Sequence, residues 1–83
     1  MNSIKIISVE ALPDYQLLVE FEDRKKKQYD VKRLMEHDVF KPLTYIKYLF
    51  AQVAVDATRC AVVWNDDIDI ASEELYYNGK DVN

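Results

Sequence analysis

Cysteine, glycine and proline are scarce in this chain, and each shortage excludes something. Its 83 residues include one cysteine, one glycine and two prolines. A single cysteine, Cys60, can form no internal disulfide and cannot supply a cysteine-based zinc site. With so few glycines and prolines, the turns must be made by aspartate, asparagine and charged residues. A lone, reduced cysteine also favours a cytoplasmic location.

Long apolar runs are missing as well. The N-terminal sequence, MNSIKIISVEALPDY, has one early lysine and no extended apolar stretch. It fits neither a signal peptide nor a transmembrane helix, so we expect no membrane association. A chain of 83 residues predicts a single domain, spanning 1–83, with a thin core. Such a core leaves little room for the deep, dry pocket that most enzymes use.

An excess of positive charge is also absent. The net charge is −4, and it is unevenly distributed along the chain. Residues 1–41 hold eight basic and eight acidic side chains, whereas residues 42–83 hold three basic and seven acidic ones. Nucleic-acid binders usually concentrate positive charge to meet phosphates. We therefore expect no direct nucleic-acid binding.

The first part of the chain contains a succession of strand patterns. Residues 4–11 predict a strand whose apolar side chains change face partway along, which indicates a β-bulge or a strand covered on both sides. Residues 15–22 alternate apolar and polar side chains, and 26–31 predict the return strand. The tip between them would lie at Glu22 to Lys25. Together these segments predict a three-strand antiparallel meander.

Two short helices are predicted next. Asp30 precedes a helical spacing of apolar residues and predicts the N-cap of a helix over 31–37. Residues 41–50 resume a helical pattern, with Pro42 tolerable only in the first turn. The side chains expected to face the core from this second helix are Leu43, Ile46, Leu49 and Phe50.

The C-terminal part returns to strands. Residues 53–57 and 60–64 predict a hairpin, and 68–70 a further short strand. Ser72 would cap a last helical turn that packs Leu75 and Tyr76 onto the sheet, and 77–83 would be a polar tail. The predicted fold class is α+β: a small antiparallel sheet, made of the N-terminal three-strand meander plus a C-terminal hairpin, with short helices packed on one face.

Several of these segments carry a family resemblance. LLVEFED, Asp30, VFKPL, VAVD and VVWNDDIDIASEELY together resemble the bacterial family known as domain of unknown function 2442, over residues 4–76. Relatives usually place glycines where this chain has Arg24-Lys25 and Thr58-Arg59, so its turns differ. The signature positions, which look structural, are Phe50, Trp64, Asp69, Leu75 and Tyr76.

The resemblance implies a small α+β fold and no activity or cofactor. Some relatives carry a helix-turn-helix DNA-binding domain after this one. Others are thought to be encoded beside small partner proteins in toxin–antitoxin-like pairs. The resemblance therefore implies a regulatory interaction module.

An acidic cluster, Asp66, Asp67 and Asp69, follows the only tryptophan. A hard cation needs several oxygen ligands that converge on one point. Alternation along a strand would place Asp67 and Asp69 on one face and Asp66 elsewhere, so we expect a turn with solvated carboxylates. The alternative is a small cation-binding or metal-dependent protein that uses these three aspartates.

No catalytic residue is predicted. His37 is the only histidine, and no serine lies in the context of a nucleophile elbow. Cys60 begins an apolar run, and a buried free cysteine behaves as a small hydrophobic residue. We therefore expect no enzyme activity, no metal site and no cofactor.

Two surface features remain. The basic run Arg24, Lys25, Lys26 and Lys27 would either contact a polyanion or protect an exposed sheet edge from unwanted pairing, and the second interpretation is favoured. Tyrosines are typical interface anchors, and a candidate partner surface consists of Tyr45, Tyr48, Tyr76 and Tyr77. Since we expect no catalysis, no metal site and no direct nucleic-acid binding, the sequence predicts a non-enzymatic protein–protein interaction module. Such a module would bind a protein partner or self-associate.

Overall fold

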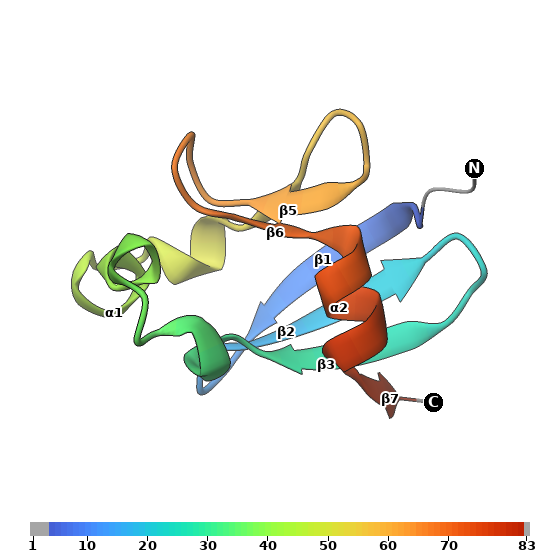
Figure 1. Cartoon of the computed structure of the whole chain (residues 1–83), viewed down its shortest axis with the longest axis horizontal. Helices are drawn as coiled ribbons and strands as arrows, with labels where there is room; N and C mark the ends of the chain where they lie inside the picture. Colours follow the sequence, from blue (N-terminus) through green and yellow to red (C-terminus); the bar gives the residue numbers. More distant parts are fainter. Residues whose placement is uncertain (1–3, 83) are drawn as a thin grey trace.

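A computed structural model describes residues 4–82, so the two ends of the predicted domain 1–83 lie outside the described residues. Within that range the chain forms two antiparallel sheets with strand orders β1-β2-β3-β7 and β4-β5-β6, and two short α-helices (Figure 1). The predicted α+β class is confirmed. The strands are β1 Ile6–Leu12, β2 Gln16–Phe21, β3 Lys26–Asp30, β4 Ala54–Val55, β5 Ala61–Val63, β6 Asp69–Ala71 and β7 Lys80–Val82. The helices are η1 Val31–Leu34, η2 Asp38–Phe40, α1 Pro42–Tyr45, η3 Phe50–Gln52 and α2 Ser72–Asn78, of which the three η elements are 3-10 helices.

The N-terminal meander has three strands in the predicted order, and of the two alternatives offered for the first strand it shows the bulge. Ile6 pairs with Phe21 and Ser8 with Glu20, so Ile7 is an extra residue in β1. The bulge turns Ile6 into the core while Ile7 stays exposed, which explains why the apolar residues change face in the sequence. The second strand begins one residue later than predicted, because Tyr15 lies in the turn with a φ of 59°.

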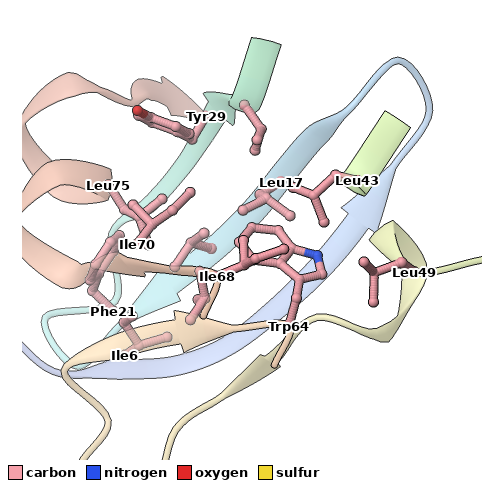
Figure 2. Packing of buried hydrophobic residues seen from close by; sticks show 13 residues of the cluster. Ile6, Leu17, Phe21, Tyr29, Leu43, Leu49, Trp64, Ile68, Ile70 and Leu75 are labelled. Atoms are coloured by element: carbon pink, nitrogen blue, oxygen red, sulfur yellow. The ribbon is translucent and has the colours of Figure 1, made fainter. Parts of the chain in front are cut away.

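The core lies between the two sheets (Figure 2). Alternate residues of β2 and Tyr29 of β3 point into it, and they meet side chains from β5, β6 and the turn before β6. The molecule is only 19 Å thick along its shortest axis, which is about the depth of two packed layers. The buried hydrophobic residues are Ile6, Leu17, Val19, Phe21, Tyr29, Val31, Leu43, Leu49, Val62, Trp64, Ile68, Ile70 and Leu75.

The predicted polar tail over 77–83 is wrong for the residues that the structure describes. Helix α2 continues to Asn78, and β7 then pairs with β3 as the fourth strand of the first sheet. The sequence of β7 has a single apolar residue, Val82, so it shows no hydrophobic alternation that would predict a strand. Backbone hydrogen bonds pair the strand with β3. Its side chains contribute too, since Nζ of Lys27 forms an ion pair with Asp81.

The start of α2 also differs from prediction. Ala71 occupies the N-cap position, and no side chain caps the helix there. Ser72 is buried instead, and its backbone N–H donates to the carbonyl of Cys60 (2.8 Å). The bond ties the first residue of the helix to the start of β5, so tertiary contact replaces the expected side-chain cap.

The two predicted central helices are much shorter than expected. Asp30 caps η1 as predicted, accepting from the N–H of Lys32 (2.9 Å), but that helix is a single 3-10 turn. The continuous helix predicted over 41–50 is wrong: α1 ends where Ile46 turns extended, with φ −90° and ψ 112°. Tyr48 then takes a φ of 69°. Leu43 and Leu49 are both buried as predicted, whereas Ile46 is exposed.

Candidate interaction surface

The segment from η2 to η3 crosses one end of the molecule and is fixed to the second sheet (Figure 1). Leu43 and Leu49 are buried in the core, as Figure 2 shows. The indole N–H of Trp64 donates to the carbonyl of Phe50 (3.0 Å), and the two rings stack with their centroids 5.9 Å apart. These contacts hold an irregular stretch of chain in one position.

That segment exposes most of the large apolar side chains found on the surface of residues 4–82. The exposed fractions are 44% for Val39, 71% for Tyr45, 48% for Ile46 and 72% for Tyr48. Two others are similarly exposed, Ile7 and Tyr77, and both lie elsewhere. We call the four side chains of Val39, Tyr45, Ile46 and Tyr48 the 39–48 face.

The backbone at Tyr48 is unfavourable for a tyrosine. Its φ of 69° lies in the left-handed region, which costs a non-glycine residue roughly 1–2 kcal/mol. The side chain gains little in return, since its ring is exposed and has only Nζ of Lys47 over it at 5.2 Å. An aromatic ring is therefore displayed to solvent from a backbone conformation that disfavours it.

A shallow groove shares Val39 and Ile46 with this face. It has a volume of about 460 Å³ and lies between the η2–α1 segment and the turn that leads into β6. One wall contains Asp38, Val39, Pro42 and Ile46, and the other contains Asn65, Asp67 and Ile68. Two carboxylates and four apolar side chains therefore share one open depression.

The predicted four-tyrosine surface is divided in the structure. Tyr45 and Tyr48 lie in or next to α1, at one end of the long axis, while Tyr76 and Tyr77 lie on α2 (Figure 1). Tyr76 is half-buried: its ring packs edge-on against Phe21, with centroids 4.9 Å apart. The four predicted tyrosines therefore lie on two separate parts of the fold, and only Tyr45 and Tyr48 belong to the 39–48 face.

The hydroxyl of Tyr76 also fixes the tip of the β2–β3 hairpin. It donates to Oδ2 of Asp23 (2.6 Å), and that bond lowers the pKa of the Asp23 carboxyl below its usual value of 3.8. Nζ of Lys25 lies 5.8 Å and Nζ of Lys27 lies 5.0 Å from the centre of the Tyr76 ring. Contact with Tyr76 raises the pKa of Lys25 above 10.5. Helix α2 and the hairpin are thus held together by charged and aromatic contacts.

The basic run is partly occupied by these contacts. Arg24 has a φ of 73° at the tip and an ion pair with Glu20 (3.7 Å), and Lys27 pairs with Asp81. The interpretation of edge protection is wrong for β3, because β7 pairs with it along Lys26 to Gln28. Whether the run contacts a polyanion stays a hypothesis.

The acidic turn does not gather its carboxylates. Oδ1 of Asn65 accepts from the N–H groups of Asp67 (2.9 Å) and Ile68 (3.0 Å), so asparagine forms the turn. Asp66, Asp67 and Asp69 are all exposed. Within residues 4–82, no three histidine, cysteine, aspartate or glutamate side chains are grouped so that they could hold a metal ion. The three aspartates therefore offer no convergent ligand set.

The two residues considered for nucleophilic chemistry lie on separate elements. His37 precedes η2 and makes no side-chain cap there. Cys60 lies before β5 and is half-buried, with Sγ 3.5 Å from Nζ of Lys5. The structure does not bring them together as a nucleophile and its base.

The family-signature residues have mostly structural positions. Trp64 and Leu75 are buried, and Phe50 and Tyr76 pack against the core. Asp69 is exposed on β6, opposite Val63. Sequence reasoning missed Val39 and Ile46 as surface residues: Val39 lies between the two predicted helices, and the helical spacing assigned Ile46 to the core. No signal in a single sequence distinguishes an exposed isoleucine from a buried one at that spacing.

The fold and its surface define a small α+β domain with one exposed apolar segment. The chain belongs to the family described as "Protein of unknown function (DUF2442)", whose profile matches residues 6–81. No curated protein matches it. Among the helices of residues 4–82, none is long and apolar enough to cross a membrane.

One solved structure has a similar fold. It is the crystal structure of a protein from Nitrosomonas europaea described as a "Putative DNA Binding Protein", and it matches with a TM-score of 0.77 and 24% sequence identity. The match covers 94% of this chain and 52% of that one, so this chain spans about half the length of the similar protein. The likeness shows the fold alone.

Proposed function

We propose that this chain is a non-enzymatic protein–protein interaction module and that a protein partner docks on the 39–48 face. The observation that carries the proposal is the concentration of exposed apolar side chains: four of the six large ones lie within ten residues of each other. Two of the four, Val39 and Ile46, also line one groove, and exposed apolar side chains that gather on a soluble protein typically mark an interaction site. A regulatory or toxin–antitoxin-like pair is the setting that we propose for it.

The way in which the face is held supports the same function. Docking costs less entropy when the binding surface is already ordered. Here Leu43, Leu49 and the bond from Trp64 to Phe50 fix the segment before any partner arrives.

The residues considered for chemistry favour binding over catalysis. A catalytic site needs a nucleophile, a base and a stabilising group within hydrogen-bond reach of one reacting atom. His37, Cys60 and the three aspartates lie on different elements, and the groove beside the 39–48 face is open. We therefore propose that the protein acts by contact alone.

The test is purification from the native host with identification of the co-eluting protein. The double substitution Tyr45→Ala with Tyr48→Asn removes both rings, and asparagine tolerates the positive φ at position 48. The matched control is Tyr77→Ala, which removes an equally exposed ring from α2. We expect the partner to be retained by the wild type and the control and lost from the double variant.

Light scattering separates a foreign partner from a second copy of the chain. A mass above that of the monomer which falls to the monomer value in the double variant would assign the face to self-association. Equal retention of every partner by the double variant and by the wild type would overturn the proposal.

DNA binding is a second candidate, favoured by the description of the similar Nitrosomonas europaea protein. The distribution of charge supports it poorly. Lys27 is paired with Asp81, and Lys25 lies against Tyr76. A depression on the face of the first sheet that points away from the core contains Glu10, Glu20 and Lys26. Its two carboxylates outnumber its one amine. DNA-binding surfaces are instead strongly positive.

A further inference from the structure

We infer that the groove beside the 39–48 face accepts a segment of the partner protein in which an aliphatic or aromatic side chain is flanked by lysine or arginine. The inference rests on the proposed function and specifies the partner's chemistry. It depends on two properties of the groove, its apolar lining and the sign of the charges at its rim.

The apolar lining can hold one side chain of moderate size. Val39, Pro42 and Ile46 contribute apolar surface from one wall, whereas Ile68 on the other wall is buried and exposes almost none. Val39 and Ile46 are 44% and 48% exposed, so a partner side chain would remove further apolar area from water.

The charged groups at the rim are acidic on both walls. The side chain of Asp38 is 95% exposed, and Nζ of Lys41 lies 3.1 Å from it. Asp67 lies on the opposite wall, and among the ion pairs of residues 4–82 none involves it. Because Lys41 already pairs with Asp38, the carboxylate of Asp67 is the charge in the groove that would attract a lysine or arginine of the partner and repel a carboxylate.

The acidic wall is also rigid. Two backbone N–H groups of the turn donate to Oδ1 of Asn65, which fixes the backbone at Asp67 and Ile68. Asp67 itself uses only its backbone N–H for this bond, and its carboxylate stays available to a partner. Substituting that carboxylate by an amide therefore changes the charge of the rim and leaves the turn intact.

The binding test uses three capped peptides: Gly-Arg-Leu-Arg-Gly, Gly-Glu-Leu-Glu-Gly and Gly-Arg-Ser-Arg-Gly. Each is titrated into the isotopically labelled protein while amide chemical shifts are followed. We expect the first peptide to bind at least about threefold more tightly than the other two, since exposed charge pairs and one buried aliphatic group each contribute modestly. The shifts should centre on Val39, Ile46, Asp67 and Ile68.

Variants locate the contact. Asp67→Asn should weaken binding of the first peptide about two- to fivefold. Its matched control is Asp66→Asn, which neutralises the neighbouring carboxylate outside the groove and should change binding less. Ile46→Ser should weaken binding on the order of tenfold. Equal binding of the arginine and glutamate peptides, shifts centred elsewhere, or no shift with any peptide would overturn the inference.

The same variants separate this inference from the proposed function. If the native partner is lost with the Tyr45 and Tyr48 double variant but unaffected by Asp67→Asn and Ile46→Ser, the function stands and the inference fails. If the native partner still binds every one of these variants, both the proposed function and the inference fail.

Discussion

Gly79 is the only glycine of the chain, and it lies where α2 gives way to β7. Its φ is −77°, so a side chain is not excluded by backbone conformation. The constraint is space: a Cβ at this position would lie 2.5 Å from the carbonyl oxygen of Leu75 and 2.9 Å from Cβ of Lys27. Position 79 therefore needs a residue without a side chain because the helix end and β3 approach so closely.

Gly79→Ala should destabilise the fold. Forcing one extra methyl group into such a contact typically destabilises the folded state by about 1–3 kcal/mol. This cost exceeds the stabilisation that alanine gives by lowering the conformational entropy of the unfolded chain. The free energy of unfolding, measured by urea denaturation, should fall by that amount. The control Lys80→Ala, at the adjacent exposed residue, should stay within about 0.5 kcal/mol of the wild type. A Gly79→Ala protein as stable as the wild type would contradict the close packing described for this junction.

At the scale of elements, β7 is attached by backbone pairing and by one ion pair. Asp81 accepts from Nζ of Lys27, and this bond lowers the pKa of the Asp81 carboxyl below 3.8. The pKa of Asp23, at the neighbouring hairpin tip, is lowered by Tyr76. A carboxyl whose pKa is lower in the folded state stabilises the fold at pH values above the unfolded pKa.

The melting temperature should therefore decrease as the pH falls below about 4, as these carboxylates become protonated and lose their partners. Asp81→Asn should remove part of this decrease, because the amide has no charge to lose. The measurement is the melting temperature of both proteins between pH 7 and pH 2. The same acid dependence in wild type and variant would show that the contact between Lys27 and Asp81 contributes nothing to stability.

The elements that could be predicted from the sequence are those whose burial follows one simple period. Strand β2 alternates buried and partly exposed residues, and its partners β1 and β3 were predicted with it. The helix predicted over 41–50 ends early although no residue within 43–50 is a helix breaker, so its end at Ile46 leaves no signal in the local sequence. Strand β7 depends on backbone pairing with β3, which leaves no trace in its own sequence.

The candidate site was predictable only in part, for a related reason. Tyr45 and Tyr48 were predicted as exposed from their place on the predicted helix, and they are exposed although that helix is broken. Grouping them with Tyr76 and Tyr77 required knowledge of how distant segments pack. The groove depends on the same knowledge, because its walls are separated by almost twenty residues of sequence.

For the whole molecule, the electrostatics argue for a protein partner. The net charge is −4, and the basic run at the β2–β3 tip is the one concentrated group of cations in the sequence. Two of its four members, Lys25 and Lys27, already contact Tyr76 or Asp81. Long-range attraction of a polyanion is therefore weak.

We expect this chain to bind duplex DNA more weakly than about 10⁻⁴ M at physiological salt, the weak end of ordinary non-specific binding. The measurement is the affinity for a DNA duplex over a range of salt concentrations. The triple substitution of Lys25, Lys26 and Lys27 by glutamine serves as comparison. Tight wild-type binding, with a salt dependence that this substitution flattens, would instead support the DNA-binding candidate and place the contact at the hairpin tip.

The contact between Trp64 and Phe50 gives the molecule an internal optical reporter. Trp64 is the only tryptophan, so the indole fluorescence of the protein comes from one site. That indole is almost completely shielded from water and hydrogen-bonded to the backbone of η3, at the base of the segment that carries the 39–48 face. Release of this segment from the second sheet would expose the ring and shift its emission to longer wavelength. Local opening at the surface can thus be followed without attaching a dye.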